Sequence, residues 1–259
     1  MSWDPGQYGK FADDRLRPVI DLLARVGRLP DAGSPDIIDL GCGAGAAFEA
    51  LRARWPGARI TGLDSDRAML EAARARHGSV HLVEADVRSW EPPGDVDLVF
   101  SNAVLHWLDG HEGLFPRLMG WLKPGGVLAV QMPVVWAEPL HVLLAEAADD
   151  PRWRDRLGDV PKPVRPLSME AYAGLLSPLA DAVDIWETRY LHRLQGENAV
   201  FEWIRGTSLK PYLDHLPSEE SAAFAEGYAA ALRSAYPVSD DGTTPLAFRR
   251  TFIVAAKSN

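Results

Sequence analysis

The chain has only one cysteine, Cys42, among its 259 residues. An internal disulfide is therefore excluded, and this is typical of a protein from a reducing compartment. Cys42 lies in a glycine-rich loop, and the sequence places no base beside it, so we interpret it as a small buried residue and not as a catalytic thiol. We expect the protein to be cytoplasmic.

Long apolar runs are also missing. The first thirty residues carry several acids and arginines and lack the apolar core of a signal peptide. No apolar run approaches the roughly 20 residues that a membrane-spanning helix needs. We therefore expect a soluble protein without a membrane partner.

The chain has no surplus of basic residues, since its formal net charge is −9. This argues against a general nucleic-acid binder, which needs a basic face. A small acidic substrate stays possible, because a local cluster of arginine or lysine can outweigh distant negative charge. No internal repeat or low-complexity tract is present, and the length favours one core with an elaboration.

What the sequence does contain is an alternation of strand and helix patterns from residue 36 to 133, which predicts a parallel sheet. Segments 183–190 and 248–255 also have strand character and would complete the sheet with an antiparallel edge strand. Ligands should then bind at the carboxyl ends of the parallel strands. The expected strands are 37–40, 59–63, 80–83, 96–101 and 126–132, and the expected helices are 45–55, 67–76 and 112–121.

We predict a single domain over residues 1–259. Further helices are expected from about residue 7 to 26 and at 139–149, 171–176, 197–208 and 218–236. The predicted segments are an N-terminal helical lid (1–30), a cofactor-binding core (31–133), helical cap insertions (134–180 and 195–245) and closing strands (181–194 and 246–257).

The most informative stretch is the loop after the first predicted strand, with Gly41, Gly43 and Gly45. Glycines at this density let the backbone turn tightly and approach a ligand closely. The pattern that ends at Ala46 also satisfies the loose dinucleotide fingerprint. Asp39, just before the first glycine, would repel a pyrophosphate but attract an ammonium group.

Two more acids follow the ends of the next two strands. Asp64 is placed to accept hydrogen bonds from ribose hydroxyls, as in other Rossmann-like sites. Asp86 is placed to accept one from an adenine amino group. Together with Asp39, these acids suit a cationic adenosine ligand, and S-adenosylmethionine (SAM) is such a molecule.

Five ordered segments (39–45, 62–65, 84–87, 97–102 and 122–126) resemble those of the class I SAM-dependent methyltransferases. The resemblance implies a Rossmann-like α/β fold with a mostly parallel seven-stranded sheet, an antiparallel edge strand and a helical cap. It also implies SAM as cofactor, S-adenosylhomocysteine as product and no metal. The residues that it assigns to the cofactor are Asp39, Gly41, Cys42, Gly43, Gly45, Asp64, Ser65, Met69, Asp86, Val87 and Asn102, with Tyr8 and Phe11 as a lid.

Further segments (3–11, 15–18, 21–26, 101–108, 131–133, 184–186 and 252–255) extend the resemblance to the trans-aconitate methyltransferases over nearly the whole chain. This resemblance implies that a carboxylate of a small polycarboxylic acid, trans-aconitate above all, is esterified. A carboxylate is already ionised at neutral pH. In-line methyl transfer therefore needs positioning and no general base, with His106 and Trp107 as candidate positioning residues.

The other carboxylates of such an acid would need partners, for which arginine is well suited. Arg249 and Arg250 enter the last strand, where successive side chains point to opposite faces, so at most one faces the site; we favour Arg250. The remaining candidates are less specific: each could belong to the core or to a solvated surface. The predicted substrate residues are Trp107, Trp136, His141, Arg205 and Arg250.

Three other functions stay open. The acceptor could be another small molecule; a hydroxyl acceptor would require a base such as His106 or His141. The chain could also bind SAM without catalysing transfer, because binding and turnover share the glycine loop. A dehydrogenase that uses a nicotinamide cofactor is disfavoured by Asp39. The sequence is compatible with a monomer and specifies no oligomer.

Overall fold

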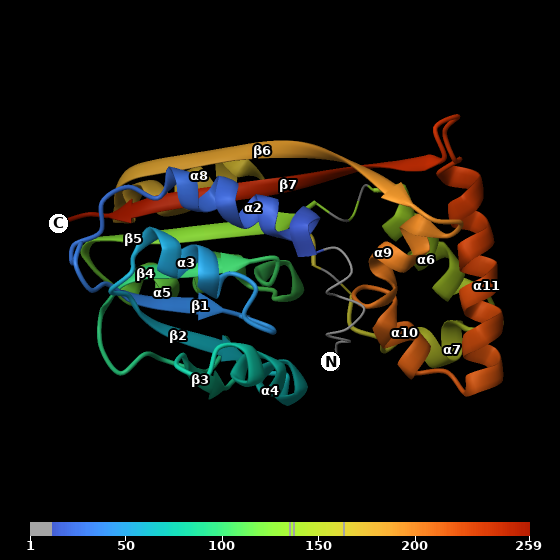
Figure 1. Ribbon diagram of the computed structural model, residues 1–259, viewed down its shortest axis with the longest axis horizontal. Helices are drawn as coiled ribbons and strands as arrows, with labels where there is room; N and C mark the ends of the chain where they lie inside the picture. The colour runs from blue at the N-terminus through green and yellow to red at the C-terminus, as the bar shows by residue number, and fades with distance from the viewer. Residues whose placement is uncertain (1–11, 135, 137, 163) are drawn as a thin grey trace. The chain divides into compact units, whose positions relative to one another are not determined.

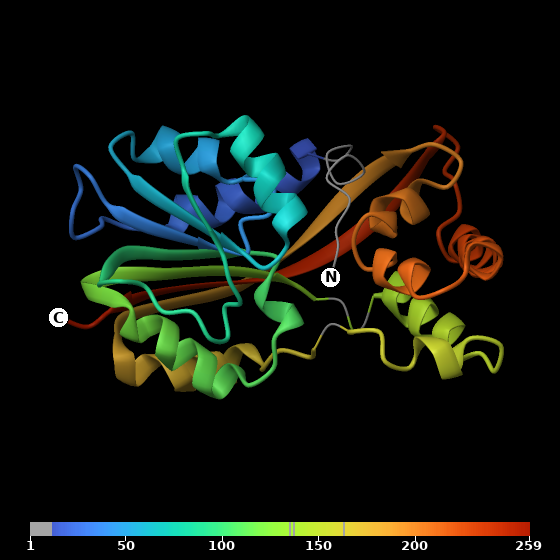
Figure 2. The same ribbon diagram turned by 90° about the horizontal axis from the view of Figure 1, so that it is seen from below.

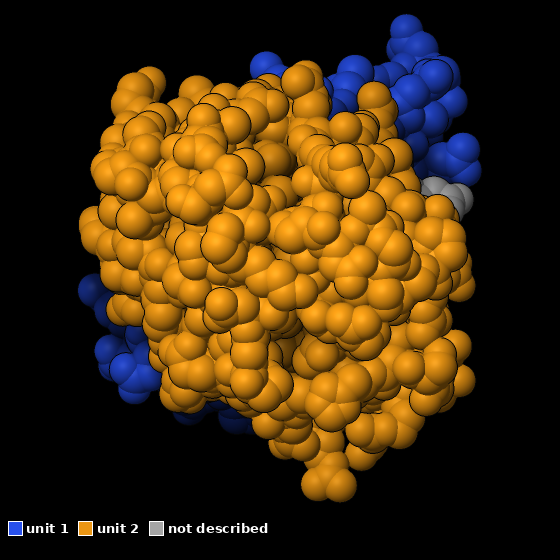
Figure 3. All heavy atoms as spheres, turned by 90° about the vertical axis from the view of Figure 1, so that its left-hand side faces the viewer, with its two compact units in different colours: residues 1–11, 134–163, 189–249 blue, residues 12–133, 164–188, 250–259 orange. Residues whose placement is uncertain are grey.

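The computed structural model describes residues 12–134, 136, 138–162 and 164–259. These residues form two compact units (Figure 3). Unit 2 comprises residues 12–133, 164–188 and 250–259, and unit 1 comprises residues 134–163 and 189–249. Among the described residues, no helix has both the length and the apolar character needed to cross a membrane.

A seven-stranded sheet in the order β3-β2-β1-β4-β5-β7-β6 organises the fold (Figure 1). Neighbouring strands from β3 through β5 pair in parallel, and β7 runs antiparallel to β5. The mostly parallel seven-stranded sheet that the sequence predicts is confirmed. The strands are β1 (Asp36–Leu40), β2 (Arg59–Asp64), β3 (His81–Glu84), β4 (Val96–Asn102), β5 (Leu122–Pro133), β6 (Ala180–Gln195) and β7 (Thr243–Lys257).

Helices cover both faces of the sheet in unit 2 (Figure 2). On one face, α5 (His111–Gly120) and α8 (Met169–Leu176) pack on a core of apolar strand residues that includes Ile38, Val99 and Val130. On the other lie α2 (Ala12–Arg25), α3 (Phe48–Arg54) and α4 (Arg67–Arg76). Two short 3-10 helices complete this unit: η1 (Leu105–Trp107) and η2 (Ser177–Leu179).

The structure locates parts of two predicted segments, the cap insertion 134–180 and the N-terminal lid 1–30. Helix α8 falls inside the predicted cap insertion 134–180, but it belongs to unit 2 because Tyr172 and Leu176 are fully buried in the sheet core. Tyr172 also hydrogen-bonds through its hydroxyl to Nδ1 of His111 at the start of α5. The described part of the predicted N-terminal lid, α2, buries Leu22 and Leu23 and contacts β5.

Unit 1 has an apolar core of its own, formed by residues such as Leu144, Trp203 and Phe224. At one end of this core, Tyr228 Oη donates to the Leu140 carbonyl (2.7 Å), and the Leu140 amide donates to Tyr236 Oη (3.1 Å). The two tyrosines thereby fix the first turn of α6 against α11. The helices are α6 (Pro139–Asp149), α7 (Arg154–Leu157), α9 (Ala199–Arg205), α10 (Lys210–Asp214) and α11 (Ser218–Ala235).

A buried carboxylate fixes the amino ends of the central strands. Asp97 of β4 is fully buried. Its Oδ1 accepts a hydrogen bond from the Asp31 amide (2.9 Å). Its Oδ2 accepts from the Asp36 amide (2.9 Å) and from Lys123 Nζ (2.7 Å). Three donors thus satisfy this charge, and they join β1, β4 and β5 at the end opposite the glycine loop.

Candidate functional site

The glycine loop follows β1, and its three glycines have positive φ angles of 66°, 54° and 81° at Gly41, Gly43 and Gly45. A Cβ on Gly41 would lie 2.2 Å from the Val104 side chain, and one on Gly45 would lie 2.7 Å from the Phe48 ring. A Cβ on Gly43 would meet no described atom within 4 Å. Gly41 and Gly45 are therefore needed for packing, whereas Gly43 faces open space that a ligand could fill.

The helix after this loop begins later than predicted. Residues 41–47 form successive turns, and α3 starts at Phe48 and has only seven residues. The tight turns at the three glycines delay the helix, so the backbone N–H groups next to the predicted ligand position belong to the loop.

Asp39, at the end of β1, is a buried carboxylate with an unused acceptor. The residue is 2% exposed, and its Oδ2 accepts no hydrogen bond from any residue that the structure describes. Burial, together with the nearby charge of Asp64, raises the pKa of Asp39 to about 8. A cationic group bound here would restore the ionised form. The sequence predicts the ammonium group of SAM at this position.

Asp64, at the end of β2, holds the glycine loop. Its Oδ2 accepts from the Gly43 amide (2.8 Å) and its Oδ1 from the Asp66 amide (2.9 Å). Burial raises the pKa of Asp64. A carboxylate oxygen can accept more than one hydrogen bond, so both oxygens keep capacity for ribose hydroxyls. The neighbouring Ser65 is exposed, and Met69 is buried in α4.

Asp86 follows β3 as predicted, but its carboxylate is already engaged. Arg88 Nε donates to Asp86 Oδ1 (3.0 Å), and Arg88 Nη2 donates to Oδ2 (2.5 Å). The hydrogen bond from the Arg88 side chain lowers the pKa of Asp86. An adenine amino group would share this carboxylate with Arg88. Val87, the next residue, is buried.

A row of polar residues crosses four adjacent strands on one face of the sheet. In the ladders, Asp39 of β1 pairs with Phe100, Asn102 with Gln131, Gln131 with Phe252, and Pro133 with Arg250. Because paired residues and residues two apart share a face, Asp39, Asn102, Gln131 and Arg250 all lie on the face opposite the α5 and α8 core. We call these four residues the polar row. It begins with a carboxylate and ends with a guanidinium.

The middle of the polar row has unused hydrogen-bonding capacity. Asn102 Oδ1 and Gln131 Nε2 are buried and have no partner among the described residues. Ala103, which follows Asn102, has a φ of +60°, which is uncommon for a residue with a side chain. Sequence reasoning assigned no role to Gln131; its one signal was a polar residue inside an apolar strand.

The predicted substrate residues divide between the two units. In unit 2, Trp107 ends η1 with its ring 5.1 Å from the His106 ring, and Arg250 is 6% exposed on β7. Unit 1 contains three others: Trp136 is exposed, His141 is half-buried in α6, and Arg205 is ion-paired with Glu202 (3.3 Å). Burial lowers the pKa of His141 to about 4, so its imidazole is neutral at pH 7. Tyr8 and Phe11 lie outside the described residues.

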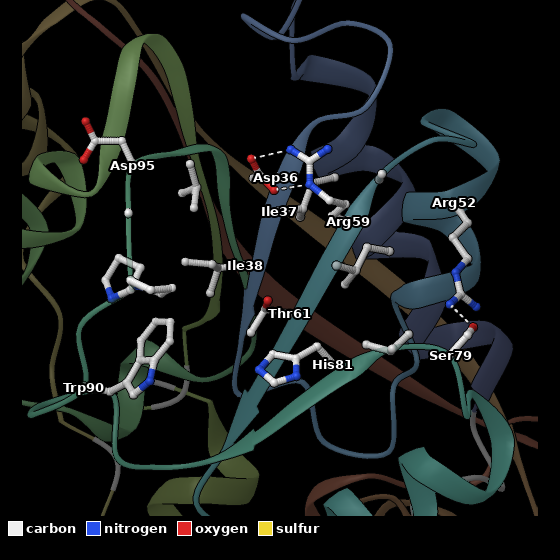
Figure 4. Close-up of a pocket in the computed structure, with 17 residues that line it drawn as sticks. Asp36, Ile37, Ile38, Arg52, Arg59, Thr61, Ser79, His81, Trp90 and Asp95 are labelled. Atoms are coloured by element: carbon white, nitrogen blue, oxygen red, sulfur yellow. Dashed lines mark hydrogen bonds and ion pairs between the residues drawn. The ribbon is translucent and has the colours of Figure 1, made fainter.

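A separate pocket of about 640 Å³ lies at the amino ends of β1, β2 and β3 (Figure 4). Figure 4 shows Asp36 and Arg59 paired beside it, with Trp90 and His81 on its walls. It contains none of the strand-end acids or loop glycines, so it is distinct from the predicted cofactor site.

Gly43→Ala should weaken SAM binding by about tenfold or more, because the new methyl group enters the open space over the loop. The left-handed backbone conformation adds about 1–2 kcal/mol of strain. Gly125→Ala is the matched control: its φ is +75°, and its Cβ would make only ordinary contacts, the nearest at 3.7 Å. Calorimetric SAM titration of both variants checks this; equal affinities would contradict the ligand position.

Comparisons with known proteins agree with this geometry. A family described as "Methyltransferase domain" matches residues 37–126. Trans-aconitate 2-methyltransferase of Paracidovorax citrulli is 46% identical, with 99% of this chain and 98% of that protein covered. The enzyme of the same name from Rhizobium meliloti is 43% identical over the full length of both chains.

Solved structures show the same fold at low sequence identity. Phosphoethanolamine N-methyltransferase 2 of Haemonchus contortus, in complex with S-adenosylhomocysteine, is 17% identical with a TM-score of 0.58, and 94% of this chain and 53% of that chain are covered. The YcgJ protein of Bacillus subtilis is 16% identical with a TM-score of 0.57, and 94% and 99% are covered. The chain therefore belongs to the trans-aconitate 2-methyltransferase family of class I SAM-dependent methyltransferases, with SAM as its cofactor.

Proposed function

We propose that the chain methylates a carboxylate oxygen of trans-aconitate or a similar small polycarboxylic acid. The observation that carries this proposal is the similarity to relatives named trans-aconitate 2-methyltransferase, which extends over 98% or more of each chain. It therefore includes the unit 1 segments as well as the cofactor core. The polar row supports the same acceptor class, because its far end is a buried arginine.

The carboxyl ends of β1 and β2 would hold the cofactor. Asp39 pairs with the ammonium group, Asp64 accepts from the ribose hydroxyls, and Gly43 leaves room for close approach. SAM supplies an electrophilic methyl group and leaves as S-adenosylhomocysteine. The acceptor carboxylate forms the new O–C bond as the S–C bond breaks, and no proton is transferred.

Arg250 would hold the acceptor. Because the residue is 94% buried, its attraction to a carboxylate is screened far less than at the surface. Charge-assisted hydrogen bonds from a guanidinium also fix the orientation of a carboxylate. Such orientation brings an acceptor oxygen in line with the methyl group, and positioning of this kind supplies several kcal/mol of rate enhancement.

Methyl transfer from labelled SAM to a panel of small carboxylic acids tests the proposal. We expect a base-labile labelled ester from trans-aconitate, at a rate that is flat from about pH 6 to 8 under saturating SAM, because a carboxylate with a pKa near 4 stays ionised. A rate that falls steeply below pH 6.5 would indicate a histidine base and a hydroxyl acceptor. SAM binding without product from any acid would refute carboxylate methylation.

A further inference from the structure

We propose that Gln131 determines acceptor specificity by donating a hydrogen bond to a carboxylate of the acceptor that is not methylated. This inference rests on the proposed function and adds a residue to the same site. Gln131 is fully buried in β5, between Asn102 of β4 and Phe252 of β7 in the sheet ladders. All of these residues belong to unit 2.

The orientation of the Gln131 amide is fixed by Arg250. The Arg250 Nη1 donates to Gln131 Oε1 at 3.2 Å. A guanidinium has donors and no acceptor, so the amide oxygen must face it. The Gln131 Nε2 group is therefore the free end of the amide, and it has no acceptor among the described residues.

A buried donor without an acceptor destabilises the protein, because it loses its hydrogen bonds to water and gains none in return. Such a cost is expected at a site where a ligand supplies the missing partner. The position argues against a purely structural amide, because two neighbours of Gln131 on the same face of the sheet, Ala129 and Phe252, are apolar and fully buried. An apolar side chain would fill the same space without this cost.

The donor groups of Gln131 and Arg250 indicate which kind of ligand they would bind. The Nε2 group of Gln131 and the guanidinium of Arg250 together present hydrogen-bond donors, and the guanidinium adds positive charge. Their partner must be a negatively charged acceptor, which in a small polycarboxylic acid is a carboxylate. Asp39, at the other end of the polar row, has the opposite polarity and suits the ammonium group of the cofactor.

The carboxylate bound by this pair is one that does not react. Strong donors would draw charge away from an attacking oxygen, and that charge disappears when the ester forms. Donors on the reacting carboxylate would therefore favour the ground state over the transition state and slow the transfer. On a second carboxylate, the same donors stabilise both states equally and set affinity and orientation.

Two variants test the proposal in steady-state assays with trans-aconitate. Gln131→Leu removes the donor at similar volume, and we expect KM for the acid to rise roughly tenfold. Gln131→Glu turns the donor into an anion that pairs with Arg250 and repels the acid, and we expect KM to rise by roughly 100-fold or more. The SAM dissociation constant should change by less than about twofold in both variants.

Dicarboxylic analogues, each lacking one carboxylate of the acid, separate a specificity role from a structural one. The KM effect of Gln131→Leu should vanish for the analogue without the bound carboxylate and persist for the analogue that keeps both the bound and the reacting carboxylates. The analogue without the reacting carboxylate forms no ester. An equal effect on every analogue would mean that the amide only supports the strand, and would overturn the proposal. Unchanged KM values in both variants would overturn it as well.

Thr251→Val is the matched control. Thr251 follows Arg250 in β7, and its side chain lies on the face of the sheet opposite to Arg250 and Gln131. Its hydroxyl donates to Glu187 (3.2 Å), so removal of this hydroxyl should leave KM unchanged. SAM binding reports whether each variant folds. If Gln131→Leu does not fold, Gln131→Glu still tests the proposal, because its carboxylate keeps a partner for Arg250. Wild-type protein that binds SAM but produces no ester would instead refute the proposed function.

Discussion

Asp39→Asn is expected to reduce SAM affinity by roughly 30-fold or more while leaving the ligand-free fold at least as stable as the wild type. Loss of one partner from a buried charge pair costs about 2–5 kcal/mol. The free protein gains from the same change, because the Asp39 carboxylate is buried without a described donor at Oδ2. Calorimetric titration with SAM and chemical unfolding of the free protein measure the two effects.

The dependence on pH gives this prediction a second measurement. The pKa of Asp39 is raised from 3.8 to about 8 in the folded protein. Between pH 3.8 and about 8, Asp39 keeps its proton in the folded state and has lost it in the unfolded state. This residue's contribution to the free energy of unfolding therefore falls as pH rises from about 4 to 8. The fall should be missing in D39N.

SAM binding should also release a proton near pH 7, because the ammonium group favours the Asp39 carboxylate. Calorimetry in buffers of different ionisation enthalpy counts this proton. Wild type and D39N with equal proton release and equal SAM affinity would contradict the role of Asp39.

Asp97→Asn should destabilise the protein by about 3–5 kcal/mol, because it removes the charge of a fully buried carboxylate and leaves the half-buried Lys123 without its closest acceptor. The new NH2 group also faces donors, since both Asp97 oxygens accept hydrogen bonds. At temperatures where the variant is folded, SAM affinity should stay within about twofold of the wild type, since distant sites act independently. Urea unfolding and SAM titration test the two parts.

Glu71→Gln is the control for this prediction. Glu71 forms an exposed pair with Arg67 at 3.2 Å, one helical turn away. Its loss should change the free energy of unfolding by no more than about 0.5 kcal/mol. A similar small effect for Asp97→Asn would show that its three hydrogen bonds contribute little to stability. Asp39 and Asp97 are buried carboxylates in adjacent strands with opposite expected effects. Their replacement by asparagine should leave the free protein at least as stable at Asp39 and destabilise it at Asp97.

The sequence-based prediction of the cofactor end of the site rests on local signals. An acid before a run of glycines, or an acid at the end of an apolar strand, can be read without knowing which strands are neighbours. Asp39, Gly43 and Asp64 were placed in this way, and the structure brings Gly43 and Asp64 into direct contact.

The rest of the site depends on sheet order and register. The role proposed for Gln131 depends on its position beside Asn102 and Arg250, which lie on strands far away in the sequence. The membership of α8 in unit 2 depends likewise on the burial of Tyr172 and Leu176 against strands far away in the sequence. The short helices α7 and α10, of four and five residues, were missed because so few residues carry no clear periodicity.

The place of β7 between β5 and β6 has a consequence for the biosynthesis of the chain. On the ribosome, β5 and β6 emerge well before the strand that separates them in the sheet. One hydrogen-bonding edge of β5 therefore stays uncovered until residues after Thr243 have been translated. In the finished protein, the β5 residues from Val127 to Met132 are all buried. Exposed edges of this kind are where nascent chains aggregate or recruit chaperones. Translation of the last strand is thus the step that closes the sheet.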